Sequence, residues 1–114
     1  MQTIAKIPEN LKDLLQVGKI FMFSKTYCPY CDRAKDLLNK LKLQFECLEC
    51  DDYPLSDKQR NQLKEMSGIT TYPNIFIGLK SIGGCDDLHK LKNNGQLHKI
   101  LKDNGVKIPE NSSL

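Results

Sequence analysis

Hydrophobic and polar positions follow two different periods along the chain, and these periods predict where its strands and helices lie. Short apolar runs rich in β-branched and aromatic residues predict buried strands at 20–23 and 75–77. Apolar and polar residues alternate over part of 44–50, which predicts a third strand. Ser81-Ile82 follows a turn at Leu79-Lys80 and completes a hairpin, so four strands are expected.

Apolar residues at helical spacing predict the remaining elements. The clearest helix runs from about 29 to 42, with charged residues between its apolar positions. Helices are also expected over 10–17, from a cap at Ser56 to about Met66 before Gly68, after a cap at Asp86, and near 97–101. The chain order α-β-α-β-α-β-β-α-α predicts an α/β fold in which a four-stranded mixed sheet carries about five helices on its two faces.

The length and charge of the chain limit the classes of protein it can be. One hundred and fourteen residues suffice for one hydrophobic core and not for two, so we expect a single domain over 1–114. The net charge of +3 is far below the basic balance of nucleic-acid-binding proteins. The first residues contain no long apolar segment, and no stretch approaches the length of a membrane span. We therefore expect a cytoplasmic protein with neither nucleic acid nor membrane as a partner.

Two of the five cysteines stand three positions apart in Cys28-Pro29-Tyr30-Cys31, between a predicted strand and a predicted helix. At the start of a helix, unpaired backbone N–H groups and the positive end of the helix dipole favour an anion, and therefore a thiolate at Cys28. Pro29 suits the first helical turn, because its φ is already helical and it lacks an N–H that would have no partner. Cys31 lies one turn further and can reach back to Cys28. We expect the chemistry of the protein at this segment.

A zinc site is the alternative that the cysteine spacing raises. Cys28-x2-Cys31-x15-Cys47-x2-Cys50 is a spacing typical of four-cysteine zinc sites. Cys47 and Cys50 stand three apart on a predicted strand, however, and so should point to opposite faces of the sheet. Two ligands that point in opposite directions cannot share one ion. We therefore expect no metal, with Cys47 a core thiol and Cys50 near the end of a strand.

Three segments together resemble the dithiol glutaredoxins, a family with the thioredoxin fold. They are Cys28-Pro29-Tyr30-Cys31, the turn Thr71-Tyr72-Pro73, and Gly83-Gly84-Cys85-Asp86-Asp87. The resemblance covers about 10–104 and leaves a short polar tail. Thioredoxins usually carry Trp before the first active-site cysteine, whereas this chain has Tyr27 there and contains no Trp.

The resemblance implies a thiol–disulfide oxidoreductase that takes its electrons from glutathione. Its substrates would be protein–glutathione mixed disulfides and protein disulfides, with Cys28 as the attacking thiolate and Cys31 as the resolving thiol. Some glutaredoxins instead bridge an iron–sulfur cluster between two protomers. Those tend to have Gly or Ser at the position of Pro29, and the monothiol cluster carriers lack the second cysteine, so both features favour the redox enzyme. Family members are mostly monomers, and we expect a monomer here.

The resemblance also implies a groove that binds glutathione, with cations at one end and an anion at the other. Lys25 and Arg60 would face the glycine carboxylate, to which the planar fork of an arginine can bind in a bidentate way. Tyr72, before a cis-proline at Pro73, would pair its backbone with the cysteinyl part of glutathione like the edge of a strand.

At the other end of the groove, the resemblance implies contacts with the γ-glutamyl group. Asp87 would bind its ammonium, and the first turn of the following helix, including the Asp86 backbone, would bind its carboxylate. The family often has Ser or Thr where this chain has Asp86, whose extra charge is a departure. Tyr30 would line the groove beside the sulfur. The implied glutathione contacts are thus Lys25, Tyr30, Arg60, Thr71, Tyr72, Pro73, Asp86 and Asp87.

Overall fold

Five strands form one mixed sheet in the order β1-β3-β2-β4-β5 in the computed structural model, which describes residues 2–3 and 7–114. The strands are β1 (Gln2–Thr3), β2 (Ile20–Ser24), β3 (Glu46–Glu49), β4 (Asn74–Ile77) and β5 (Lys80–Gly83). β1, β3 and β2 run parallel, whereas β4 is antiparallel to β2 and to β5. The four predicted strands are therefore present. β1 extends the sheet beside β3 by two residues, too few for a sequence pattern to reveal.

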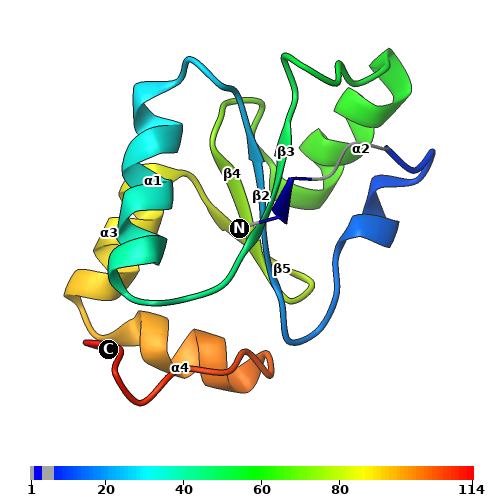
Figure 1. Ribbon diagram of the computed structural model, residues 1–114. Helices are drawn as coiled ribbons and strands as arrows, with labels where there is room; N and C mark the ends of the chain where they lie inside the picture. Colours follow the sequence, from blue (N-terminus) through cyan, green and yellow to red (C-terminus); the bar gives the residue numbers. More distant parts are fainter. Residues whose placement is uncertain (1, 4–6) are drawn as a thin grey trace.

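Helices cover both faces of this sheet (Figure 1). α1 (Pro29–Lys40), α3 (Cys85–Asn93) and α4 (Gln96–Asp103) lie on one side, and α2 (Asp57–Ser67) lies on the other. Each face has its own hydrophobic core. Leu38, Leu88 and Leu101 pack on the side of α1, whereas Leu63 packs on the side of α2.

Strand β2 contributes to both cores because successive side chains of a strand point to opposite faces. Ile20 and Met22 join the core on the side of α1, and Phe21 and Phe23 join the core on the side of α2. All five residues of β2 are buried, since the strand lies between β3 and β4. Only residues 25–28 separate the end of β2 from α1, so the centre of the sheet determines where this loop lies.

The first predicted helix is wrong in type. Instead of a helix over 10–17, the chain forms a single 3-10 turn, η1 (Leu11–Leu14). The Asn10 side chain accepts a hydrogen bond from the Lys12 N–H, and Leu15 already has an extended backbone, so the helical bonding pattern ends there. The described residues thus contain four α-helices, where the sequence predicts about five helices.

The predicted ends of α2 are confirmed. The Ser56 hydroxyl accepts a hydrogen bond from the Gln59 N–H at 3.1 Å, and the Gln59 side chain accepts one from the Ser56 N–H at 2.9 Å. Gly68 ends the helix with φ 76°, a left-handed conformation that glycine adopts without steric cost. These local signals position the helix that carries Arg60.

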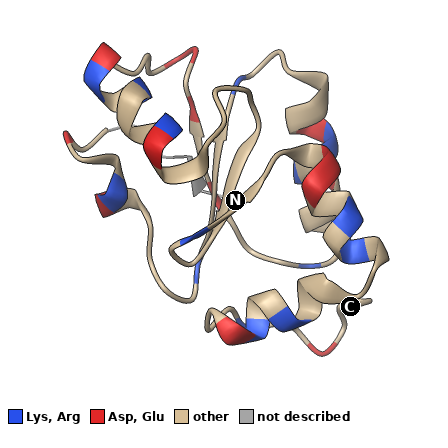
Figure 2. Cartoon of the chain, turned by 180° about the vertical axis from the view of Figure 1, so that it is seen from behind, with Lys and Arg blue, Asp and Glu red and all other residues tan. Residues whose placement is uncertain are grey.

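Charged residues of both signs are interspersed over the helices (Figure 2). This pattern is typical of solvated helix faces. No helix in the part of the chain that the structure describes is both long enough and apolar enough to cross a membrane. Glu49, at the end of β3, is a charged residue that is nevertheless 7% exposed, and it lies close to the active-site helix.

Candidate active site

The loop between β2 and α1 places Cys28 at the N-terminus of α1. Cys28 is the N-cap residue, and its Sγ accepts a hydrogen bond from the Cys31 N–H at 3.1 Å. Pro29 occupies the first turn, as the sequence predicts. The sulfur therefore takes the place that a Ser or Asp oxygen has in other helices, where the helix dipole favours negative charge.

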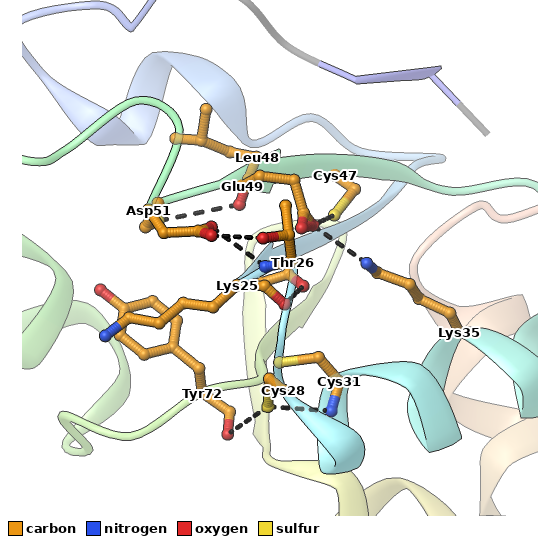
Figure 3. A network of polar contacts seen from close by, with 12 residues as sticks. Lys25, Thr26, Cys28, Cys31, Lys35, Cys47, Leu48, Glu49, Asp51 and Tyr72 are labelled. Atoms are coloured by element: carbon orange, nitrogen blue, oxygen red, sulfur yellow. Dashed lines mark hydrogen bonds and ion pairs between the residues drawn. The ribbon is translucent and has the colours of Figure 1, made fainter.

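The turn before β4 faces Cys28 from the other side (Figure 3). The peptide bond between Tyr72 and Pro73 is cis, as the resemblance implies. The Tyr72 carbonyl oxygen lies 3.7 Å from the Cys28 Sγ, and Figure 3 shows the two groups facing each other. Thr71 is exposed beside this turn and Pro73 is buried. Cys28 is half-buried, so the sulfur can be reached from solvent between the helix and the turn.

Cys31 lies one turn into α1 and is fully buried. Burial and hydrogen bonding with Cys28 raise the pKa of Cys31 to about 11, although Ser24 and the Lys25 backbone act in the opposite direction. Cys31 is therefore a thiol at neutral pH. The two cysteines of the motif differ in both access and surroundings.

The other three cysteines are buried as well. Burial, with Glu49 beside it, raises the pKa of Cys47 to about 12. Burial raises the pKa of Cys50 to about 11, and burial together with Asp86 raises the pKa of Cys85. All five cysteines are free thiols, and Cys28 is the one that is not buried.

Comparison with known proteins identifies the family of this site. Residues 20–82 match the family model described as Glutaredoxin. A glutaredoxin from Vernicia fordii is 40% identical over 95 residues, which are 83% of this chain and 91% of that protein. The chain belongs to the glutaredoxin family. Glutaredoxins are thiol–disulfide oxidoreductases, and this chain is accordingly such an enzyme.

Two further proteins are similar to this chain, one in sequence and one in structure. Glutaredoxin-1 of Rhizophagus irregularis is 38% identical over 98 residues, which are 86% of this chain and 97% of that protein. The crystal structure of a buckwheat glutaredoxin–glutathione complex superimposes with a TM-score of 0.75 at 36% identity, over 83% of this chain and 86% of that chain. The thioredoxin-like fold is thus confirmed.

Two of the predicted glutathione contacts lie next to the two cysteines. The Lys25 Nζ lies 4.9 Å from the centroid of the Tyr72 ring, a cation–π distance. Burial, with the Cys50 thiol beside it, raises the pKa of Tyr72 to about 12, so the ring carries a neutral hydroxyl. Tyr30 is 53% exposed, and the Arg33 Cζ lies 5.7 Å from its ring centroid. Lys25 and Tyr30 thus lie on the open side of the site.

Arg60 is held by local contacts at the start of α2. Its Nη1 donates to the Leu55 carbonyl oxygen at 2.6 Å, and its Nη2 pairs with the Asp57 carboxylate. Arg60 also acts to lower the pKa of Tyr72, against the stronger effect of burial, so it lies on the Tyr72 side of the site. Both terminal nitrogens of the Arg60 guanidinium are therefore already engaged in contacts within the protein.

The first turn of α3 carries the two predicted aspartates, both exposed. α3 begins at Cys85, and the Asp87 Oδ2 accepts a hydrogen bond from the Gly84 N–H at 3.0 Å. The predicted cap at Asp86 is therefore wrong, because Asp87 supplies the cap from within the first turn. Gly83 has φ +99°, and a Cβ there would collide with the Asp87 carboxylate. The glycine is thus required for this bond.

Sequence reasoning misses a buried polar network beside α1 (Figure 3). The Lys35 Nζ and the Cys47 Sγ each lie 3.0 Å from the Glu49 Oε1. Burial opposes the charge of Glu49, but hydrogen bonds from Cys47, Lys35 and Ser24 hold its pKa below the usual range. Burial likewise opposes the charge of Lys35, yet the contact with Glu49 raises its pKa. The sequence contained one signal of this network. Glu49 stands on a predicted strand of a sheet that was expected to be covered on both faces, so its charge would need a partner.

A second pair that sequence reasoning misses ties the Cys28 loop to the end of β3. The Thr26 N–H donates to the Asp51 Oδ1 at 3.0 Å, and the Thr26 hydroxyl bonds to the other carboxylate oxygen. The hydrogen bond from the Thr26 side chain lowers the pKa of Asp51. Thr26 therefore anchors the loop that carries Cys28 to Asp51, just after β3.

The positions of Cys47 and Cys50 exclude a zinc site made of the four cysteines. Cys47 belongs to the core on the side of α1, and Cys50 belongs to the core on the side of α2. The prediction that they point to opposite faces is confirmed. A tetrahedral site requires its four ligands around one ion, which these two cannot provide together.

Proposed function

We propose that this glutaredoxin reduces protein–glutathione mixed disulfides and protein disulfides with electrons from glutathione. The observation that carries the proposal is the contrast between Cys28 and the four buried cysteines. A thiolate, not a thiol, attacks a disulfide sulfur. Cys28 combines access from solvent with a helix N-terminus and an N–H donor at 3.1 Å.

In the monothiol route, the Cys28 thiolate attacks the glutathione sulfur of a mixed disulfide. A bond forms between Cys28 and glutathione, and the protein thiolate leaves. A second glutathione thiolate then attacks the glutathione sulfur on Cys28, which releases glutathione disulfide and restores the Cys28 thiolate. The helix N-terminus that favours the thiolate also makes Cys28 a good leaving group in this second step.

In the dithiol route, the Cys28 thiolate attacks a protein disulfide and forms a mixed disulfide with one of its sulfurs. Cys31 then loses its proton and attacks Cys28, so that the Cys28–Cys31 bond forms as the second protein thiolate leaves. Two glutathione molecules reduce this internal disulfide in turn. The Cys31 N–H contact with the Cys28 Sγ supports this pairing, because it places the two residues on one helical turn.

The exposed groups around Cys28 suit an extended glutathione molecule. Lys25, whose Nζ lies beside the Tyr72 ring, would bind the glycine carboxylate, and Arg60 would contribute less because the Leu55 carbonyl already accepts one of its hydrogen bonds. The backbone of Thr71 and Tyr72 before Pro73 would pair with the cysteinyl part, and Tyr30 would line the groove beside the sulfur. The first turn of α3 would bind the γ-glutamyl group through Asp86 and Asp87.

Two cysteine variants test this function in a glutathione-coupled turnover assay. Cys28→Ser should abolish reduction of every substrate, because no other cysteine is accessible. Cys31→Ser should keep the reduction of glutathione mixed disulfides and lose the reduction of protein disulfides. Cys50→Ala, a buried cysteine outside both routes, is the matched control and should keep both activities. An active Cys28→Ser protein together with an inactive Cys31→Ser protein would reverse the two roles.

A further inference from the structure

The ammonium of Lys25 and the aromatic ring of Tyr72 meet beside the loop that carries Cys28. The Lys25 Nζ lies 4.9 Å from the centroid of the Tyr72 ring, and Figure 3 shows the lysine side chain lying across that ring. In the proposed function, the Lys25 ammonium binds the glycine carboxylate of glutathione, and Tyr72 contributes its backbone. The Tyr72 ring has no part in either proposed route, yet it touches the cation that both routes use.

Lys25 is held in a different way from the other two cations of this region. Lys35 and Arg60 each pair with a carboxylate of the protein, which balances their charge. In the part of the chain that the structure describes, Lys25 belongs to no ion pair. The negative face of an aromatic ring attracts a cation without neutralising it. The charge of Lys25 therefore stays available for an anionic ligand.

The core, and not the lysine, sets the position of the Tyr72 ring. Tyr72 packs against the hydrophobic core on the side of α2. The backbone at Lys25 is fixed as well, because it follows β2 directly and the next N–H, that of Thr26, donates to the Asp51 Oδ1 at 3.0 Å. The lysine stem between these fixed points has four flexible carbons. A ring at a fixed place therefore limits where the ammonium at the end of that stem lies.

We propose that the Tyr72 ring holds the Lys25 ammonium in place for the glycine carboxylate of glutathione, and so makes the enzyme selective for substrates that carry this carboxylate. The ring lies on one side of the ammonium, and the N–H donors directed away from the ring remain for the ligand. A cation that is already in position loses less conformational freedom when the ligand binds. The Tyr72 side chain is a positioning group, because it acts through Lys25. This inference rests on the proposed function, in which Lys25 binds glutathione.

Two substrates that differ only in the glycine carboxylate measure this selectivity. They are mixed disulfides of one peptide with glutathione and with glutathione amide, in which a neutral carboxamide replaces the carboxylate. Rapid mixing with reduced protein gives the second-order rate of peptide release. The wild type should react about fivefold faster with the glutathione form, the value for one lost charge-assisted hydrogen bond. Tyr72→Leu should slow the glutathione form about threefold and leave the amide form unchanged, so its selectivity should fall below about twofold.

Further variants assign the selectivity to the ring and to the lysine. Tyr72→Phe keeps the ring and should keep the selectivity of the wild type. Lys25→Gln should react equally with both substrates, and adding Tyr72→Leu to it should change neither rate, because the ring acts through the lysine. The matched control is Tyr53→Leu, which removes another partly buried tyrosine that packs against the same core. Its selectivity should stay that of the wild type.

Phenylalanines with increasing numbers of ring fluorines in place of Tyr72 separate the charge of the ring face from its packing. Fluorine withdraws negative charge from the face and changes the shape of the ring little, so the selectivity should fall with each added fluorine. A ring that only fills space would give the same selectivity throughout the series, and the inference would then be wrong. Should the Tyr72→Leu protein not fold, this series decides alone.

The outcomes separate this inference from the proposed function. If the wild type releases no peptide from either substrate, the proposed function is wrong. If it reacts equally with both, Lys25 does not bind the glycine carboxylate, and the proposed contact and the inference fail together. If the wild type is selective and Lys25→Gln is not, but Tyr72→Leu keeps the fivefold selectivity, the inference alone is wrong. An equal loss of rate with both substrates in Tyr72→Leu would have the same meaning, because the ring would then shape the site without acting through Lys25.

Discussion

Cys28 and Cys47 are the same kind of side chain in opposite surroundings. The Cys28 sulfur is half-buried at a helix N-terminus and accepts a hydrogen bond from an N–H at 3.1 Å. The Cys47 sulfur is fully buried in β3 and donates to a Glu49 carboxylate oxygen at 3.0 Å. One environment favours an anion, and the other keeps the proton on sulfur. The comparison teaches that access and the direction of a hydrogen bond, rather than cysteine spacing, decide which thiol reacts.

The largest expected difference is in the rate of alkylation. Iodoacetamide at pH 7 should modify Cys28 about a thousandfold faster than Cys47, because Cys47 is buried and its pKa is raised to about 12. Peptide mass spectrometry after timed quenching identifies each modified residue. In urea the rates should converge, since the fold alone creates the difference. Faster reaction at Cys47, Cys50 or Cys85 in the folded protein would contradict the comparison.

The partner of Cys47 should also matter for stability. Glu49→Ala leaves the Lys35 ammonium unpaired at 16% side-chain exposure, and the free energy of unfolding should fall by about 3 kcal/mol. Glu46→Ala removes the carboxylate of a more exposed pair, with Lys19 at 53%, and should cost less than about 1 kcal/mol. Urea titrations of both variants give the comparison. Equal losses would show that burial of the Lys35–Glu49 pair has no energetic consequence.

Alkaline pH should destabilise the protein through Cys47. The folded protein keeps the Cys47 proton up to a pKa of about 12, whereas the unfolded chain loses it above the ordinary value of 9.0. Between these values the unfolded state binds fewer protons, so the free energy of unfolding falls as pH rises. From pH 9 to 11 the loss from Cys47 should be about 2 kcal/mol.

Urea titrations across this pH range isolate the contribution of Cys47. Cys47→Ala should flatten the pH dependence by that amount, even though the variant starts from a lower stability because it leaves a small cavity. An identical slope in Cys47→Ala and the wild type would show that Cys47 does not hold its proton in the folded state.

Features governed by local chemistry could be predicted from the sequence. The ends of α2 at Ser56 and Gly68, and the start of α1 at Pro29, depend on residues that lie within one turn of the feature itself. The opposite directions of Cys47 and Cys50 follow from the strand period alone. The 3-10 turn at η1 could not be predicted, because the bond between the Asn10 side chain and the Lys12 N–H competes with the helix that periodicity favours.

The buried contacts among Lys35, Glu49 and Cys47 could not be predicted from the sequence, for a different reason. Lys35 follows the polar face of α1 in sequence, and only the packing of α1 against β3 brings it to Glu49, fourteen positions away. Periodicity specifies which face of an element is buried, but not which polar groups meet across two elements.

The smallest expected effects concern Lys25 and Arg60, the two cations of the proposed glutathione contacts. Lys25→Gln should raise the KM for glutathione about fivefold with little change in kcat, the value for one lost charge-assisted hydrogen bond at a partly exposed site. Arg60→Gln should raise it less than about twofold, because the Leu55 carbonyl and Asp57 already occupy part of the guanidinium. Steady-state kinetics with glutathione varied at a fixed mixed disulfide give both values.

Alkylation of the same two variants connects this prediction to the comparison of thiols. If Lys25 serves glutathione and not the sulfur alone, the KM of Lys25→Gln changes more than its rate of alkylation at Cys28. If the Lys25→Gln protein instead had an unchanged KM and a slower alkylation of Cys28, Lys25 would act electrostatically on the Cys28 sulfur and would not bind glutathione. A larger KM effect from Arg60→Gln than from Lys25→Gln would mean that the guanidinium leaves Asp57 when glutathione binds, and the contacts seen here would then describe the ligand-free arrangement of α2.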